Sequence, residues 1–295
     1  MLFRSTSAAN LQITIPYGVT TIRYLAVGGG ASGTRGRCNY IYGQGGGGGE
    51  VLDSSASVTA NAIIYVTVGS GGSAISGSCP GTVAGNAGSA SKIGTSSSGT
   101  EIANARGGSG PSPVSSTNPN GGASGNGNAG GVVTFDSSGN CSLSQCAAGG
   151  GGGAGAAGSG INGGIGIASN ITGTNTYFGG GGAGRNQSGS GTAGSGGGAT
   201  SASCNATANT GGGGSDCSSG TTSGAGGSGV VYIRYTVPNS LTWTRITGTG
   251  KSSTPASSLW RDISTSNDGT KIIAASYGNG LWLSSNSGKI GRAHV

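Results

Sequence analysis

Runs of glycine are the feature that most restricts how this chain can fold. Of its 295 residues, 70 are glycine, roughly three times the usual frequency of about 7%. Glycine has no side chain to bury, and it loses more backbone entropy on ordering than any other residue. A conventional apolar core along the whole chain is therefore excluded. The longest runs are 45–49, 149–153, 179–182, 196–198 and 211–214.

The glycine-dominated middle, residues 107–228, has two remaining interpretations. Collagen requires glycine at every third position together with abundant proline, whereas these glycines are clustered and the chain has only 7 prolines. Disordered chains usually carry a high net charge, but only 7% of these residues are charged. The middle is either ordered by backbone hydrogen bonds between close-packed glycine segments or a flexible Gly/Ser linker. We expect essentially no α-helix, because glycine costs about 1 kcal/mol per helical position.

Strand patterns lie on both sides of this middle. Leu11, Ile13 and Ile15 alternate with polar residues, which is the period-two pattern of a half-buried strand. Strand-like pieces also occur at 20–27, 62–68, 91–95, 100–105, 131–135 and 229–236. Because chain ends that pair across a long insertion form one domain, we expect a single all-β domain over residues 8–237.

After residue 238 the composition changes, and all three tryptophans fall in the stretch 238–288. Strand patterns begin at Trp260 and cover 271–276 and 280–284, with a turn signal at 267–269. Residues 284–288 resemble the front half of an Asp-box, with Asn286 at the aspartate position, a motif of sialidase-like β-propellers. The resemblance implies a truncated propeller fragment of about one blade, which is too short to bury a core alone.

The last seven residues, 289–295, back-translate to AAG ATC GGA AGA GCA CAC GTC, which matches a common short-read sequencing adapter. We expect them to be a sequencing artefact at the end of a truncated metagenomic reading frame and exclude them from the fold. Without Lys289 and Arg292 the formal net charge falls from +7 to +5. The only histidine, His294, is also lost.

The reactive side chains argue against an enzyme. Without His294 there is no histidine to serve as a base beside a nucleophile. The seven carboxylates are sparse, and the one close pair in the glycine-rich part, Glu50 with Asp53, fits a solvated turn better than an acid–base pair. No helix is expected after any glycine run, so a nucleotide-binding loop is excluded. We therefore expect no catalysis and no cofactor.

Basic residues and cysteines limit the partners and the location. The basic side chains are scattered singly, which argues against nucleic acid, and no stretch approaches about 18 consecutive apolar residues, so we expect no membrane span. Six cysteines without a C-x-x-C pair favour disulfides in an oxidising compartment over a metal site. Local spacing predicts the pairs Cys141–Cys146 and Cys204–Cys217. The start of the chain lacks the apolar core of a signal peptide.

Five pieces of the sequence, in order, resemble the glycine-rich domain family. They are Ile13–Ile22, Tyr24–Gly30, Gly45–Val51, Tyr65–Gly69 and Gly226–Tyr235. The resemblance covers most of residues 11–236 and implies a β-framework that carries packed polyglycine II helices. Such a helix has three residues per turn and no internal hydrogen bonds, like polyproline II. Domains of this family occur in phage tail-fibre adhesins, other viral and bacterial surface proteins, and animal receptor ectodomains.

The resemblance implies an extracellular or virion-surface adhesin or structural module that binds a host receptor protein or a glycan. Tyr and Arg are favoured contact residues, so the loops 35–42 and 177–185 are candidate binding surfaces. The candidate ligand contacts are Arg35, Arg37, Tyr40, Tyr42, Tyr177, Phe178 and Arg185. An alternative role for these aromatics is to cap the ends of glycine helices.

Two other functions stay open at this point. One is an accessory domain of a truncated secreted enzyme that acts on glycosides. The other is an ice-binding polyglycine II protein. The sequence also leaves a homo-oligomer open.

Overall fold

The computed structural model describes residues 1–6, 10–35, 42–77, 83–96, 101–113, 120–133, 147–186, 188–217, 222–237, 243–246, 260–266, 271–277 and 280–284. In this described part every regular element is a β-strand, and no helix that could cross a membrane is present. The chain divides into a large unit, Met1–Ile15 with Thr20–Tyr235, and a small unit, Pro16–Val19 with Thr236–Val295.

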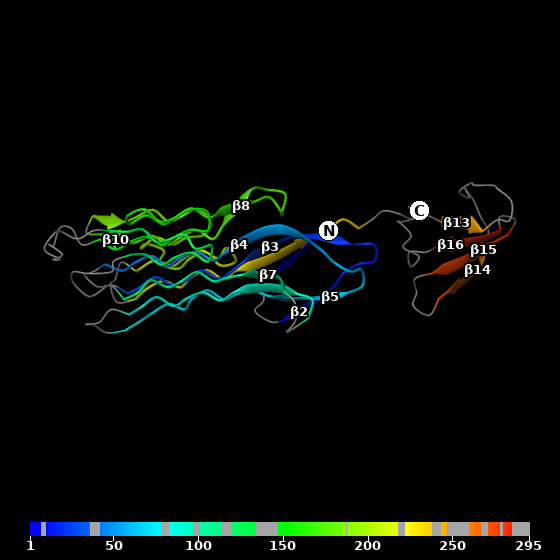
Figure 1. Ribbon diagram of the computed structural model, residues 1–295, viewed down its shortest axis with the longest axis horizontal. Coiled ribbons are helices and arrows are strands. Elements are labelled where there is room, and N and C mark those ends of the chain that lie inside the picture. The colour runs from blue at the N-terminus through cyan, green and yellow to red at the C-terminus, as the bar shows by residue number, and fades with distance from the viewer. Residues whose placement is uncertain are drawn as a thin grey trace. The chain divides into compact units, whose positions relative to one another are not determined.

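Two four-stranded antiparallel sheets form the framework of the large unit (Figure 1), with strand orders β1-β12-β3-β4 and β2-β5-β6-β7. Their strands are β1 (Leu2–Ser5), β2 (Leu11–Thr14), β3 (Thr21–Val27), β4 (Val51–Ser57), β5 (Ile63–Thr67), β6 (Ser91–Gly94), β7 (Glu101–Ala105) and β12 (Val230–Arg234). Because β12 lies between β1 and β3, the last strand of the unit completes the sheet that the first strand begins.

Six of the seven strands predicted for this unit are present, as β2, β3, β5, β6, β7 and β12. The strand predicted at 131–135 is wrong, because residues 131–133 are not in a strand. The N–H of Gly131 donates instead to the carbonyl of Gly150, 2.7 Å away, and Val132 is 61% exposed. The paired valines suggested a strand, but the residue before them bonds to a glycine segment.

Strand β3 is buried on both faces because it is central in the framework. Its Tyr24 and Ala26 side lies toward β6 and β7 of the other sheet. Its Leu25 and Val27 side belongs to an apolar cluster under the hairpin of β8 (Ile167–Ser169) and β9 (Thr176–Phe178). In that cluster the ring of Phe178 meets Tyr232 edge-on, with 6.4 Å between ring centroids.

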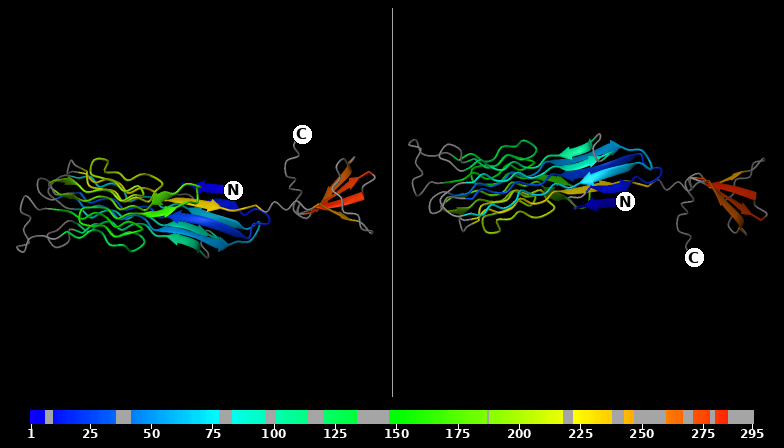
Figure 2. Two further views of the ribbon diagram at one scale, coloured as in Figure 1. Left: turned by 90° about the horizontal axis from the view of Figure 1, so that it is seen from above. Right: turned by 90° about the horizontal axis from the view of Figure 1, so that it is seen from below.

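Outside the sheets, glycine segments run side by side as extended chain (Figure 2). We call this set the glycine array; its principal segments are 28–34, 43–50, 106–109, 121–125, 149–154, 179–184 and 211–214. Residues 43–50 are all buried. They lie at the centre of the array, because their hydrogen bonds reach all six of the other principal segments.

Successive backbone N–H groups of this central segment donate to three different neighbouring segments. The N–H three residues further along donates to the same neighbour again. The pairs are Gly45–Gly149 and Gly48–Gly152, Gly46–Gly214 and Gly49–Gly211, and Gly47–Ser109 and Glu50–Arg106, with N···O distances of 2.8 to 3.3 Å. Its carbonyls accept N–H groups from three other segments. With the donor named first, the pairs are Gly122–Gly45 and Gly125–Gly48, Ala31–Gly47 and Gly28–Glu50, and Gly182–Gly46. None of these bonds is internal to the segment, so its order depends on its neighbours.

Segment 28–33 shows the same three-residue rotation, with donors that reach segments 44–50, 86–89 and 224–227 in turn. Its pairs are Gly28–Glu50 and Ala31–Gly47, Gly29–Ser89 and Ser32–Asn86, and Gly30–Gly227 and Gly33–Gly224. The described part of the middle is therefore a hydrogen-bonded structure rather than a free Gly/Ser linker.

The framework joins the array through an ion pair at the end of the central segment. The N–H of Glu50 donates to the Arg106 carbonyl, and the Arg106 N–H donates back to the Glu50 carboxylate, both at 2.8 Å. The Arg106 guanidinium adds a bond of 3.0 Å to the same oxygen. Glu50 is only 8% exposed, so the expectation of a solvated turn is wrong at this residue.

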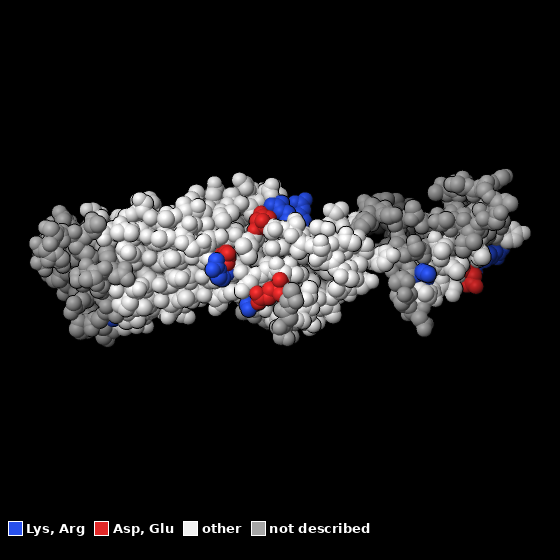
Figure 3. All heavy atoms as spheres, in the orientation of Figure 1, with Lys and Arg blue, Asp and Glu red and all other residues white. Residues whose placement is uncertain are grey.

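Asp53 also has a structural role. It accepts hydrogen bonds from Arg23 and from the Ser169 hydroxyl, at 2.8 and 2.6 Å. Burial raises the pKa of Asp53, but these bonds outweigh it, so the pKa lies below its usual value. On the face shown in Figure 3, the acidic and basic side chains of the large unit sit in adjacent groups over the framework, and the described part of the array is almost uncharged.

The small unit is one antiparallel sheet of order β13-β16-β15-β14. Its strands are β13 (Trp243–Ile246), β14 (Trp260–Thr265), β15 (Ile272–Ser276) and β16 (Gly280–Ser284). The last three were predicted and β13 was not. Among the described side chains of these four strands only Ala274 is buried. The expectation that this piece is too short to bury a core stays a prediction.

We predict that Gly47→Ala lowers the free energy of unfolding by about 3 kcal/mol, the upper end for overpacking. A Cβ at this position would collide with the backbone carbonyl of Ala123, which already accepts the N–H of Ser109 at 2.9 Å. Urea unfolding followed by circular dichroism measures the loss.

Gly77→Ala is the matched control, because an added Cβ there meets only the end of the Arg35 side chain, 3.1 Å away. A Gly47→Ala protein as stable as Gly77→Ala would show that the array tolerates side chains and is not closely packed.

Candidate functional site

In the large unit the first and last residues lie together at one end, and the short strands β10 and β11 lie at the opposite end. The Met1 ammonium donates to the Tyr235 carbonyl at 2.7 Å, so both ends of the unit's chain lie together at the framework. The array extends from there to β10 (Arg185–Asn186) and β11 (Gly189–Ser190) (Figure 1). We call this far end the tip.

Five residues from four separate parts of the sequence form a cluster at the tip. The Arg185 guanidinium carbon lies 5.3 Å from the centroid of the Tyr42 ring, within the range of a cation–π contact. The N–H of Gly43 donates to Oδ2 of Asp216 at 2.8 Å. The Ser201 hydroxyl lies near the Asp216 carboxylate and helps to lower its pKa. We call Tyr42, Gly43, Arg185, Ser201 and Asp216 the tip cluster.

Asp216 is the buried acid of this cluster, with 1% of its surface exposed. Burial raises the pKa of its carboxyl to about 6. The hydrogen bond from Gly43, the positive charge of Arg185 and the Ser201 hydroxyl oppose this rise, but only in part. The tip thus contains a carboxyl group that titrates near neutral pH.

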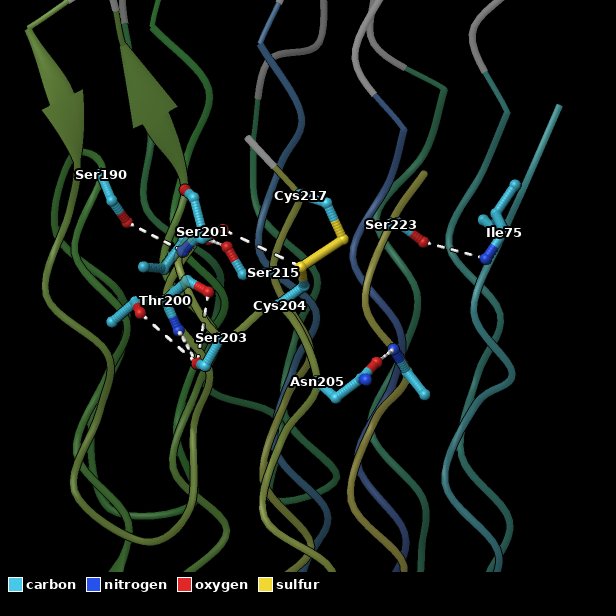
Figure 4. The surroundings of a disulfide bond; sticks show 12 residues. Ile75, Ser190, Thr200, Ser201, Ser203, Cys204, Asn205, Ser215, Cys217 and Ser223 are labelled. Atoms are coloured by element: carbon cyan, nitrogen blue, oxygen red, sulfur yellow. Dashed lines mark hydrogen bonds between the residues drawn. A yellow bond between two sulfur atoms is a disulfide. The ribbon is translucent and has the colours of Figure 1, made fainter. Parts of the chain in front are cut away.

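A disulfide braces the tip next to this carboxylate (Figure 4). Cys217 follows Asp216 directly and is bonded to Cys204, with a Cα–Cα distance of 5.0 Å. The Cys204 carbonyl also accepts the N–H of Ser215 at 2.9 Å. The structure therefore contains the predicted Cys204–Cys217 pair, whereas Cys141 and Cys146, like Cys38 and Cys79, lie outside the described residues.

Of the seven candidate contacts, the structure brings Tyr42 and Arg185 together. Arg37 and Tyr40 lie outside the described residues. Arg35 reaches the tip, but it is only 3% exposed. Its assignment to the binding surface is therefore corrected: its side chain is packed inside the unit.

The other two candidates lie at the framework end of segment 179–184, on β9. Phe178 is 4% exposed and belongs to the apolar cluster, so its assignment as a contact is also corrected. Tyr177 is 42% exposed, because successive side chains of a strand point to opposite faces. Tyr177 is separated from Arg185 at the tip by the whole of segment 179–184.

Sequence reasoning did not identify Gly43, Ser201 or Asp216. The one available signal was that Asp216 is the only carboxylate between Asp136 and Asp262, so an isolated acid stood in a nearly uncharged region. In the described part of the chain, no three His, Cys, Asp or Glu side chains gather where they could hold a metal ion.

The amino-acid sequence was compared with models of known protein families. The family model described as "Glycine-rich domain" matches residues 5–236. The chain belongs to the glycine-rich domain family. The match runs from the end of β1 to just beyond β12, so both sheets, the array and the tip are parts of this glycine-rich domain. No curated protein matches the chain.

We predict that Asp216→Asn removes a pH dependence of the domain's stability. A pKa raised from 3.8 to about 6 means that the folded state binds the proton more tightly. The contribution of Asp216 to stability is therefore complete below about pH 4 and is lost as pH rises through 6, by up to about 3 kcal/mol. Thermal unfolding between pH 4 and 7.5 should show this slope, with a smaller slope in Asp216→Asn. Equal slopes in the two proteins would contradict the assignment.

We also predict that the double variant Cys204→Ser, Cys217→Ser is less stable by about 3 kcal/mol, because the cross-link closes a loop with a sequence separation of 13. Dithiothreitol should destabilise the parent protein at least as much, since it also reduces any other disulfide. Urea unfolding with and without reductant measures both effects. A double variant as stable as the oxidised parent would show that this disulfide does not brace the tip.

Proposed function

We propose that this glycine-rich domain is a non-catalytic recognition module of an extracellular or virion-surface protein. In this proposal the module holds its tip away from its attachment point and binds a cell-surface protein or glycan there. The supporting observation is the placement of the chain ends: Met1 and Tyr235 adjoin at the framework, and the tip cluster lies at the other end of the array. The disulfide next to Asp216 supports an oxidising, extracellular environment.

In this proposal the glycine array is a bundle of polyglycine II helices. A change of partner at every residue, with a return after three residues, is expected for a helix with three residues per turn and no internal bonds. The six neighbours of segment 43–50 are the number expected in a close-packed bundle of rods. Lateral bonds on all sides make such a bundle a rigid support for its tip.

The small unit, in the same proposal, is a fragment of an Asp-box β-propeller. A propeller blade is a four-stranded antiparallel sheet, and β13 to β16 form a sheet of that size and type. The Asp-box resemblance at 284–288 starts at the last residue of β16.

Amide hydrogen exchange on the intact, oxidised chain tests the polyglycine II bundle. Residues 45–49 should exchange as slowly as the central strand β3, because these residues are buried and each N–H donates to a carbonyl of a neighbouring segment. Exchange at unfolded-chain rates in 45–49, with β3 still protected, would contradict the bundle and leave a spacer of another kind.

Binding of the intact chain to whole bacterial and animal cells and to a printed glycan array tests recognition at the tip. Tyr42→Ala should weaken binding to any responsive cell or glycan by about tenfold or more, in the range of an interface hot spot. Tyr177→Ala is the matched control, since it removes an exposed tyrosine at the framework end, and it should bind normally. Equal binding by the two variants, or no binding to any cell or glycan, would contradict recognition at the tip.

A further inference from the structure

One side of the glycine array is formed by a layer of three segments, which we call the outer layer. Its segments are 70–77, 83–90 and 107–113. They extend β5, β6 and β7 away from the framework and are drawn in cyan and blue-green in Figure 1. The middle segment bonds to both of the others: the Ser89 N–H donates to the Ser70 carbonyl at 2.9 Å, and the Gly88 N–H donates to the Gly108 carbonyl at 3.0 Å. On the inner side, N–H groups of segment 28–33 donate to it.

Every third residue of the middle segment faces away from these neighbours. Ala84 and Ala87 are exposed, whereas a Cβ added at Gly85 or Gly88 would collide with neighbouring chain. Neither the N–H nor the carbonyl of the two alanines bonds to a residue in the described part of the chain. Because a threefold helix repeats its directions every three residues, the alanines form an open row of donors and acceptors with a spacing of about 9 Å.

The two flanking segments present small side chains with the same period. Ser73 and Ser76 are exposed on one side of the row, and Ser109 and Ser112 are exposed on the other. Val83 adds an apolar group that is 42% exposed. The three segments of the outer layer contain no charged residue. Another backbone can therefore approach this face closely and without removing a charge from water.

Unpaired backbone groups at the edge of a structure pair with another chain unless charges, prolines or bulges prevent it. Three of the four edge strands of the framework sheets carry a charged residue: Arg4 on β1, Asp53 on β4 and Glu101 on β7. Such residues make the sheet edges poor templates for pairing. The outer layer has no charged residue to play this part, so its open row is the better template.

A second copy of the outer layer is the partner that matches this surface. Segments of the array pack on one another because their donors and acceptors recur every three residues. A second copy has the same period and the same small side chains. Each exposed alanine offers one donor and one acceptor, so two layers related by a twofold axis can satisfy each other.

We propose that the outer layers of two copies of this chain pack face to face and continue the glycine array across the interface. The inference goes beyond the proposed function and does not depend on what the tip binds. The outer layer lacks the tryptophan, tyrosine and arginine side chains that dominate tight interfaces. We therefore expect a weak dimer, with a Kd of roughly 100 μM.

Sedimentation velocity of the intact, oxidised chain tests the association. The average mass should rise from that of a monomer toward that of a dimer between about 5 and 500 μM, a range that brackets the expected Kd. Amide hydrogen exchange at Ala84 and Ala87 reports on the face itself, and it should be at least about tenfold slower in the concentrated protein. A monomer at every concentration, or a dimer without this added protection, would overturn the proposal.

Ala87→Arg should raise the Kd of the dimer at least about tenfold, or 1.4 kcal/mol, because it places a long charged side chain in the open row. Ala84→Arg, on the same row, should repeat the effect, whereas Ala87→Ser keeps a small side chain and should associate like the parent. Thermal unfolding shows that each variant is folded.

Ala157→Arg is the matched control, since it adds the same charge at an exposed alanine of the array outside the outer layer. It should associate like the parent. Equal weakening by Ala87→Arg and Ala157→Arg would show repulsion between net charges, and an undiminished dimer in Ala87→Arg would show that another surface associates. Either result would overturn the assignment of the outer layer.

Discussion

The structure of the large unit depends on one constraint, the backbone hydrogen-bonding requirement of segments that make no bonds within themselves. Each residue has a donor and an acceptor that must be paired when it is buried. Residues 43–50 are buried and bond only to other segments. Neighbouring backbones must therefore approach so closely that a Cβ at most of these positions would collide with a carbonyl group. The high glycine content is the consequence of this packing.

The same constraint separates the unit into two kinds of interior. The array has too few apolar side chains to form a core, so hydrophobic burial is concentrated in and around the two sheets, in residues such as Leu25, Ile64 and Val231. At the junction, Glu50 and Arg106 exchange backbone and side-chain bonds, so the array begins from a chain whose position the sheets already determine. The sheets therefore fix the register, and the lateral bonds carry it outward.

Chemistry is confined to the ends of such a structure. The array admits little beyond glycine, alanine and serine, so large or charged side chains can gather only over the framework or at the tip. At the framework the acids are paired with arginine or lysine. At the tip, Tyr42, Arg185 and Asp216 come together from three segments, and a disulfide closes beside them. The tip is therefore the part of this glycine-rich domain that can vary in chemistry without disturbing its packing.

The amino-acid sequence by itself determined the all-β class, most framework strands and the presence of the array. Alternation at Leu11, Ile13 and Ile15 and the glycine runs are local properties that can be read without the fold. The strand predicted at 131–135 failed because side-chain propensity does not specify which backbone a segment bonds to. For the same reason only the tertiary structure decided the site. Residue type alone predicted Tyr42, Arg185 and Phe178 as contacts alike. Pairing between segments far apart in sequence brought Tyr42 and Arg185 together beside Asp216, whereas it buried Phe178 beneath a hairpin.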